Sequence, residues 1–305
     1  MKIVILGAGM QGTLYGVRLA RAGHSVTLIA RGRRAEELRN HGAVIEHGLT
    51  GRREVEQLPV CERLNADMRA NLCLITVRRE QIDDVLPALC AADRIDRFLV
   101  MVNHACGSSA LFAAVGRERI VLGFPGAAGG IENGVDRYVE VAEQRTVIES
   151  IAPDVAALLR TAGFQVDLAA DMDSWLQRHA VFVTAVSGAL YAVGGDAKRL
   201  SSDKGQVRNL IIAIRQAWAA MDRHGIAPAP MALRVIFQWA PLQFAIYYWR
   251  RLLGSPKGDY YFARHSRHAA KEMAALASDV RTLLVDDAMP QLQQLYAAID
   301  AAAAA

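Results

Sequence analysis

The chain has few cysteines for its length, and this scarcity limits the kinds of protein that it can be. Only 4 of its 305 residues are cysteine. They form no Cys-x-x-Cys pair and no spacing typical of metal ligands. The four are Cys61, Cys73, Cys90 and Cys106. This pattern excludes a disulfide-stapled secreted domain and a cysteine zinc site. We therefore expect reduced thiols in a cytoplasmic protein that holds no metal ion.

The chain also lacks a long unbroken apolar run and a large excess of one charge. Its most apolar long stretch, residues 231–253, is interrupted by Arg234, Pro241 and Arg250. This stretch therefore predicts no membrane span and no membrane partner. The 35 lysines and arginines exceed the 31 acidic residues by a formal charge of +4. So mild an excess predicts no nucleic-acid partner, but it suits a small anionic ligand.

What the sequence does contain is a dinucleotide-binding fingerprint at its start. Residues 2–6 read Lys-Ile-Val-Ile-Leu, the pattern of a buried parallel strand, and a Gly-x-Gly-x-x-Gly turn and a helical pattern follow. Such glycines permit a tight turn, close approach of a pyrophosphate and close packing of the helix on the strand. Free N–H groups at the helix start then face the phosphates. The predicted pyrophosphate-binding residues are Gly7, Ala8, Gly9, Met10, Gln11 and Gly12.

A basic turn after the second predicted strand indicates which dinucleotide binds. Residues 25–29 form this strand, and Arg31, Arg33 and Arg34 follow it. In the NAD form of the fingerprint an acidic residue near this point binds the ribose 2′-hydroxyl, whereas an arginine accommodates a 2′-phosphate. Arg31 lies about twenty residues past the glycine turn, so the sequence predicts NADP(H) as the cofactor.

The order of the expected elements defines the fold class and two domains. Strand and helix patterns alternate up to residue 170, which predicts an α/β Rossmann domain with a mostly parallel sheet over residues 1–170. Helical patterns dominate residues 171–305, which predicts an all-helical domain for substrate binding or dimerisation. Two long helices are expected at residues 231–253 and 266–284, and a glycine-rich stretch, 126–130, follows the strand expected at residues 120–124.

Polar residues follow two further predicted strands of the Rossmann domain. Thr76, Arg78 and Gln81 lie at and just after the end of strand 72–77, and Asn103 and His104 follow strand 98–102. Open α/β sheets bind their ligands outside the carboxyl ends of the strands. We therefore expect these residues near the ligand.

These motifs together resemble the ketopantoate reductase family, in which a Rossmann domain precedes a helical domain. The turn Gly-Ala-Gly-Met-Gln-Gly is similar to the cofactor loop of the family, and Arg31 matches an arginine that helps to select NADP. Arg78 takes the place of a family lysine and Gln81 that of a glutamine three residues on. Asn103 matches an asparagine between nicotinamide and substrate. Residues 123–130 look like the loop near the substrate, and on this basis Ala127 is added to the cofactor-binding residues.

The resemblance is weaker in the second half of the chain. The family has a catalytic lysine in the first helix of the second domain, with asparagines four and eight residues later. Aligning on Ala180-Val181 puts Arg178, Phe182 and Val186 at these three positions. Lys257 falls where the family has a glutamate. The resemblance thus implies an NADP-dependent oxidoreductase that is divergent at its catalytic positions and acts on a substrate other than ketopantoate.

Reduction of a carbonyl needs a proton for the developing alkoxide, and the sequence offers two candidates beside Asn103 for the catalytic site. Arg178 keeps the charge of a lysine but holds its proton tightly. His104 can protonate an alkoxide near neutral pH. Two alternatives stay open: a genuine 2-dehydropantoate 2-reductase in which Arg178 replaces lysine, and a non-catalytic NADP-binding sensor or scaffold. The expected partner is a small-molecule substrate, and a homodimer is the arrangement considered for the assembly.

Overall fold

The computed structural model describes residues 1–141, 144–228 and 231–305. The chain divides into two compact units. The first unit comprises Met1–Val102 and Ser108–Met172, and the second comprises Asn103–Gly107 and Asp173–Ala305. The short segment 103–107 therefore belongs to the second unit, although it lies within the stretch that the sequence assigns to the Rossmann domain.

The first unit is built on a sheet of eight strands in the order β12-β11-β8-β7-β6-β1-β2-β5. The six neighbouring strands β8, β7, β6, β1, β2 and β5 are parallel to one another. Strand β11 pairs antiparallel to β8 and parallel to β12. This mostly parallel sheet confirms the predicted α/β class. The strands are β1 (Lys2–Leu6), β2 (Ser25–Ile29), β5 (Val60–Cys61), β6 (Ala70–Ile75), β7 (Ile95–Val100), β8 (Ile120–Phe124), β11 (Thr146–Glu149) and β12 (Val166–Ala169).

A second sheet of four strands, in the order β4-β3-β10-β9, completes the strands of the first unit. Its members are β3 (Ala43–His47), β4 (Arg53–Glu56), β9 (Ala127–Glu132) and β10 (Val135–Glu140). The loop that the resemblance implied at residues 123–130 is therefore not observed as such, because its first residues end β8 and residues 127–130 belong to β9. Asn133 and Gly134 connect β9 to β10 with positive φ angles of 52° and 77°. This is the Asn-Gly turn that two-residue hairpins favour.

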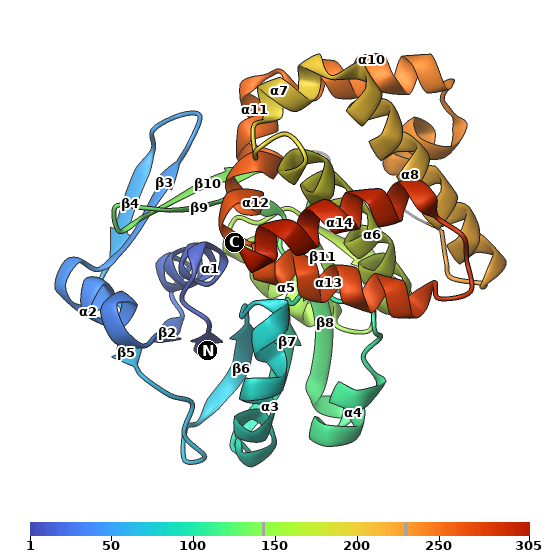
Figure 1. Ribbon diagram of the computed structural model, residues 1–305. Helices are drawn as coiled ribbons and strands as arrows, with labels where there is room; N and C mark the ends of the chain where they lie inside the picture. The colour runs from blue at the N-terminus through green and yellow to red at the C-terminus, as the bar shows by residue number, and fades with distance from the viewer. Residues whose placement is uncertain (142–143, 229–230) are drawn as a thin grey trace. The chain divides into compact units, whose positions relative to one another are not determined.

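Helices connect the strands of the first unit. They are α1 (Met10–Arg21), α2 (Gly32–His41), α3 (Ile82–Ala91), α4 (Ser109–Val115) and α5 (Pro153–Thr161), with short 3₁₀ turns η1 (Arg79–Gln81) and η2 (Arg117–Arg119). Helix α1 contacts strands of both sheets and lies between them in Figure 1. Its buried side includes Leu14, Val17 and Leu19. The helix is therefore fixed on two sides, which also fixes the turn that precedes it.

The second unit is helical, as predicted. Its elements are α6 (Met172–Tyr191), α7 (Ala197–Ser202), α8 (Lys204–Arg223), α9 (Met231–Arg234), η3 (Val235–Trp239), α10 (Leu242–Leu253), α11 (Pro256–Gly258), η4 (Asp259–Ala263), α12 (Arg264–His268), α13 (Ala270–Leu283) and α14 (Pro290–Ala304). The helix expected over residues 231–253 is broken at Pro241, because proline cannot supply the N–H that a continuous helix needs. The helix expected over 266–284 is interrupted at Ala269.

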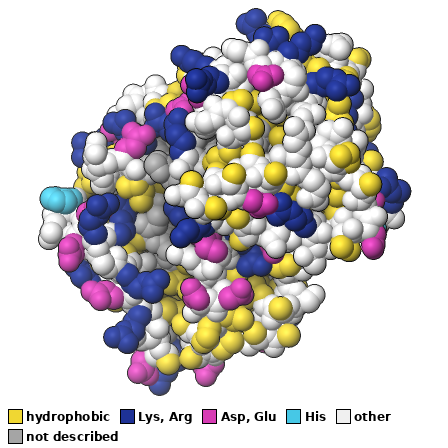
Figure 2. Space-filling model, viewed as in Figure 1, with side chains coloured by type: hydrophobic (Ala, Val, Ile, Leu, Met, Phe, Trp, Pro, Cys, Tyr) yellow, Lys and Arg dark blue, Asp and Glu magenta, His cyan; other side chains and the backbone are white. Residues whose placement is uncertain are grey.

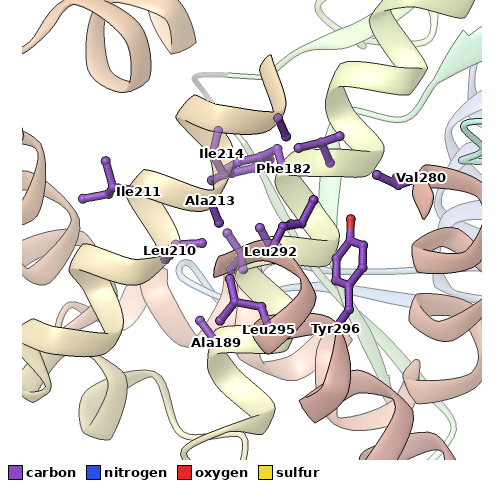
Figure 3. Packing of buried hydrophobic residues seen from close by; sticks show 14 of the residues in the cluster. Phe182, Ala189, Leu210, Ile211, Ala213, Ile214, Val280, Leu292, Leu295 and Tyr296 are labelled. Atoms are coloured by element: carbon purple, nitrogen blue, oxygen red, sulfur yellow. The ribbon is translucent and has the colours of Figure 1, made fainter. Parts of the chain in front are cut away.

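Apolar side chains from α6, α8, α13 and α14 form the core of the second unit (Figure 3). Phe182 of α6 and Leu292 of α14 are among them. One polar group in this core is satisfied internally, since the Thr184 and Tyr296 hydroxyls lie 2.8 Å apart. Within the described ranges, no helix combines the length and the apolar character needed to cross a membrane.

Candidate functional site

A cavity of about 900 Å³ opens in the first unit at the carboxyl ends of β1, β2 and β6. Several residues that the sequence assigns to the cofactor line it. They are Gly7, Ala8, Gly9, Arg31, Thr76, Arg78 and Gln81. The apolar residues Val77 and Val85 also line it. The cavity therefore combines a glycine turn, basic groups and an apolar surface, as expected for a site that binds a nucleotide.

The three glycines of the turn have different structural roles. Gly7 has φ +108°, and a Cβ there would lie 2.8 Å from the carbonyl carbon of Thr76. A Cβ on Gly12 would lie 2.0 Å from the Gly7 oxygen. A Cβ on Gly9, in contrast, would meet nothing within 4 Å. The first and third glycines thus permit close packing, whereas the second faces open space where a ligand can approach the backbone.

The side chain of Thr76 helps to hold this turn in place. Its Oγ1 donates a hydrogen bond of 2.7 Å to the Gly7 carbonyl. This bond joins the end of β6 to the end of β1, two strands that pair in parallel. Thr76 therefore stabilises the glycine turn through this hydrogen bond and also lines the cavity.

Arginines outnumber acidic residues around the cavity. The basic side chains are Arg31, Arg33, Arg34, Arg63 and Arg78, and the acidic ones are Glu37, Glu62 and Asp84. Arg31 is exposed, as a ligand-binding arginine at this position requires. The excess of guanidinium groups favours a polyanionic ligand, because these groups bind phosphate with two parallel hydrogen bonds.

Arg63 is a lining residue that the sequence reasoning missed. It follows β5, which pairs in parallel with β2, so the two strands end at the same edge of the sheet. Arg63 therefore reaches the same cavity as Arg31. The signal that could have revealed it is the short Val60-Cys61 strand before it, which is too brief to stand out as a pattern.

Arg34 forms hydrogen bonds and an ion pair that join α2 to the glycine turn, to α1 and to β10. Its Nε donates to the Ala8 carbonyl at 2.9 Å, and its Nη2 donates to Thr13 Oγ1 at 2.9 Å. Nη2 also forms an ion pair with Asp136 of β10, which is completely buried. Burial raises the pKa of Asp136 to about 6, although the nearby Arg34 opposes this shift. Sequence reasoning placed Arg34 in the basic turn but gave no role to Asp136.

Five of the predicted cofactor residues do not line the cavity, and one lining residue has a local role. The five outside its lining are Met10, Gln11, Gly12, Asn103 and Ala127. The Gln11 side chain donates to the Ala127 carbonyl, which joins α1 to β9. Gln81 lines the cavity, but its Oε1 accepts a hydrogen bond of 3.1 Å from the Arg78 N–H. It thus orders the backbone that carries Arg78.

Asn103 and His104 belong to the second unit, with the segment that follows β7. Backbone bonds of Ala105 to Asp279 and Gln177 anchor this segment, each at 3.4 Å. His104 is buried. The Oδ1 atom of Asn103 is also buried, and it accepts no hydrogen bond from the described residues. A buried amide oxygen of this kind is suited to accept a bond from a ligand.

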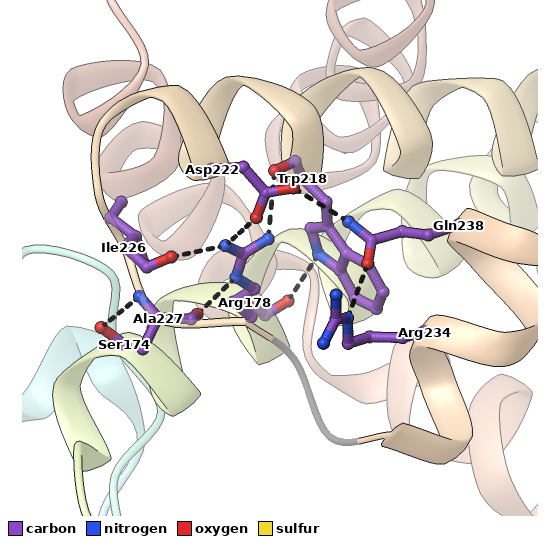
Figure 4. A network of polar contacts seen from close by, with 8 residues as sticks. All are labelled: Ser174, Arg178, Trp218, Asp222, Ile226, Ala227, Arg234 and Gln238. Atoms are coloured by element: carbon purple, nitrogen blue, oxygen red, sulfur yellow. Dashed lines mark hydrogen bonds and ion pairs between the residues drawn. The ribbon is translucent and has the colours of Figure 1, made fainter.

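The resemblance puts Arg178 at the position of the catalytic lysine of the family, and in the structure its side chain is enclosed by other residues of the protein. Its side chain is 1% exposed on α6. Its guanidinium donates to the carbonyls of Ala227 at 2.8 Å, Trp218 at 3.1 Å and Ile226 at 2.6 Å (Figure 4). It also pairs with Asp222 at 2.6 Å. These contacts place Arg178 in the packing of the second unit, where it ties α6 to α8 and to the residues that follow α8.

Phe182 also lies in the interior of the second unit. It is 6% exposed and contacts the rings of Phe237, Trp249 and Phe262, with centroids 5.7, 5.8 and 6.1 Å away. Val186, one turn further along α6, is 1% exposed. Both positions are thus filled by apolar packing. Lys257 places its Nζ 5.8 Å from the centre of the Tyr261 ring.

Basic and acidic side chains are interspersed on the face of the protein that Figure 2 shows. That face therefore carries both signs of charge, in keeping with the mild net charge of +4. The cavity is lined by five arginines and three acidic residues.

The fold and the cavity together define a dinucleotide-binding protein of the Rossmann class. The sequence profile of the family described as "Ketopantoate reductase PanE/ApbA" matches residues 3–152. A 2-dehydropantoate 2-reductase from Pyrococcus horikoshii is 32% identical over 124 residues, which cover 39% of this chain and 38% of that protein. Over residues 3–152 the chain is therefore similar to the ketopantoate reductase PanE/ApbA family.

Solved structures resemble both units of the chain. A ternary structure of D-mandelate dehydrogenase with NADH and anilino(oxo)acetate has a TM-score of 0.78 at 15% identity, covering 100% of this chain and 98% of that one. A PanE/ApbA family ketopantoate reductase from Ralstonia eutropha JMP134 has a TM-score of 0.75 at 21% identity, covering 100% and 99%. At these identities the likeness shows the fold, which agrees with the predicted order of a Rossmann domain and a helical domain.

Proposed function

We propose that this chain binds NADP(H) and transfers hydride between the cofactor and the carbonyl or hydroxyl group of a small substrate other than ketopantoate. The observation that carries the proposal is the cavity of about 900 Å³ in which the glycine turn and five arginines meet. The open space beside Gly9 is the second observation, because a pyrophosphate can approach the backbone there. The cofactor supplies the hydride, and this chain supplies its binding, its orientation and the proton.

Each part of NADP(H) has a candidate group in the chain. The glycine turn at the start of α1 suits the pyrophosphate, since the first N–H groups of a helix have no acceptors within it. Arg31 suits the 2′-phosphate, with Arg63 beside the same cavity. Val77 and Val85 offer an apolar surface for the adenine. Asn103 carries a buried amide oxygen that suits the nicotinamide carboxamide.

The substrate proposal is a 2-keto acid, or the matching 2-hydroxy acid, that is less polar than ketopantoate. Similarity to D-mandelate dehydrogenase and to ketopantoate reductases supports this chemical class. Phe182 and Val186 lie in the apolar core of the second unit, so these two positions offer no hydrogen bond to a substrate hydroxyl, which supports the lower polarity. His104 is the proposed proton donor, since an imidazole can give up its proton near neutral pH. The buried contacts of Arg178 with Ala227 and Asp222 support His104 rather than Arg178 for this role.

A fluorescence titration with NADPH and with NADH tests the cofactor. We expect tighter binding of NADPH, and we expect Arg31→Ala to weaken NADPH about tenfold or more, because a charge-assisted hydrogen bond contributes about 1.5–3 kcal/mol. Arg53→Ala, an exposed arginine of β4 outside the cavity, is the matched control and should change neither affinity. Equal affinities of the wild type for NADH and NADPH would overturn the choice of NADP(H).

Oxidation of NADPH in the presence of 2-keto acids tests the reaction. The panel contains ketopantoate and phenylglyoxylate, the keto acid that corresponds to mandelate. We expect turnover with an aromatic or otherwise less polar keto acid and little with ketopantoate. Efficient reduction of ketopantoate would refute the substrate proposal and favour a genuine 2-dehydropantoate 2-reductase. Tight binding of NADPH without turnover of any compound would favour a sensor or scaffold.

A further inference from the structure

Arg34 lies beside the candidate cofactor cavity, yet most of its contacts are with the protein rather than with the open space. Its side chain is 17% exposed in the first turn of α2. Nε bonds to the Ala8 carbonyl at 2.9 Å and Nη2 bonds to Thr13 Oγ1 at 2.9 Å. The nearby Glu37 carboxylate is 3.7 Å from Nη1. The guanidinium thus joins the glycine turn to the first helix that follows it.

The contact with Ala8 controls the orientation of one peptide group. The peptide between Ala8 and Gly9 is trans, so its carbonyl and its N–H point in opposite directions. Because Arg34 holds the carbonyl on one side, the Gly9 N–H is turned to the other. Gly9 lines the cavity, and the space beside its Cα is open. Holding the carbonyl therefore holds an N–H donor in place for an anion.

Asp136 fixes the guanidinium in turn. It comes from β10 of the second sheet, is completely buried and pairs with Arg34 Nη2. A buried carboxylate that pairs with a single arginine restricts the positions that the arginine can occupy. Three elements are linked in this way: β10 positions Arg34 of α2, and Arg34 positions the turn between β1 and α1.

We propose that Arg34, held by Asp136, is a positioning residue that sets the Ala8–Gly9 peptide for the diphosphate shared by NADPH and NADH. The inference rests on the proposed function, because it presupposes a dinucleotide in this cavity. It assigns the two arginines separate tasks: Arg31 recognises the 2′-phosphate, whereas Arg34 acts on the part common to both cofactors.

The dissociation constants of NADPH and NADH distinguish these tasks. Arg34→Met removes the bond to Ala8, and we expect it to weaken both cofactors by the same factor, about tenfold or more. Arg34→Lys retains one charged donor and should recover part of the affinity for both. Arg31→Ala, the matched control, should weaken NADPH alone. Asp136→Asn, which keeps the shape of the side chain, should weaken both cofactors equally and by a smaller factor than Arg34→Met.

Three results would overturn the inference in distinguishable ways. If Arg34→Met weakens NADPH alone, Arg34 contacts the 2′-phosphate directly. If Arg34→Met and Asp136→Asn both bind like the wild type, the peptide orientation does not depend on the pair. In either case the proposed function survives. If the wild type binds neither cofactor nor inorganic pyrophosphate as a competitor, the proposed function fails and this inference fails with it.

Discussion

Replacement of Arg178 by methionine should destabilise the second unit without affecting the cofactor cavity. Methionine fills much of the same volume, but it removes the Arg178 donors from three carbonyls and from Asp222 Oδ1, whereas Gln238 still donates to Asp222 Oδ2. Each buried group without a partner costs about 1–3 kcal/mol, and breaking a buried ion pair costs about 3–5 kcal/mol in total. Because Asp222 is half exposed and can recover water, we expect the loss to lie near 3 kcal/mol.

Urea unfolding followed by tryptophan fluorescence measures this loss, since Trp218 itself contacts Arg178. Thermal unfolding of the second unit should shift down by roughly 10 °C. NADPH affinity should stay unchanged, because the cavity is lined by first-unit residues. The matched control is Arg208→Met, an exposed arginine on α8, which should leave stability within about 0.5 kcal/mol of the wild type. Unchanged stability of Arg178→Met together with a raised KM for substrate would refute the structural role.

Three further changes test other parts of the structure. Gly12→Ala places a Cβ 2.0 Å from the Gly7 oxygen, so NADPH affinity in a fluorescence titration should fall at least tenfold; an unchanged affinity would contradict the close packing. Phe182→Ala opens a cavity in the aromatic core and should cost about 3–5 kcal/mol in urea unfolding, whereas a loss below about 1 kcal/mol would show that the core collapses around it. Burial raises the pKa of Asp136 to about 6, so between about pH 4 and 6 this carboxyl is protonated more often in the folded state than in the unfolded state. The free energy of unfolding should therefore fall as the pH rises through that window. In Asp136→Asn the free energy of unfolding should lose this dependence on pH. The same pH dependence in the variant and the wild type would contradict the raised pKa of Asp136.

The local features of the fold were predictable because neighbouring residues encode them. The strand at residues 2–6 and the glycine turn after it are contiguous, and Gly7, Ala8 and Gly9 of this turn line the cavity. The mostly parallel sheet follows from alternating strand and helix patterns. The stretch 126–130 was harder, because its glycines favour a loop locally while pairing with β10 makes it a strand. Tertiary pairing outweighed local propensity at that point.

The candidate site was predictable only where its residues follow recognisable strands. Arg31 and Arg78 come directly after strands and line the cavity. Arg63 follows a strand of two residues, too short for a pattern. Asp136 lies 102 positions from Arg34 along the chain, so their pairing depends on how the second sheet folds. Arg178 illustrates a different difficulty. Its position in a family pattern suggested a catalytic role, but the sequence could not show that its guanidinium bonds to carbonyls of α8 and of the residues after it.

Arg31 and Arg34 illustrate why composition alone cannot assign roles within a basic cluster. Both are arginines of one turn, and both line the same cavity. Arg31 is exposed, whereas Arg34 is largely buried and bonded to Ala8, Thr13 and Asp136. An exposed guanidinium can adapt to a ligand phosphate, while one fixed by several bonds can only orient its neighbours. Cofactor preference and cofactor affinity should therefore respond to different substitutions, and changing Arg31 alone should alter the preference without disturbing the turn.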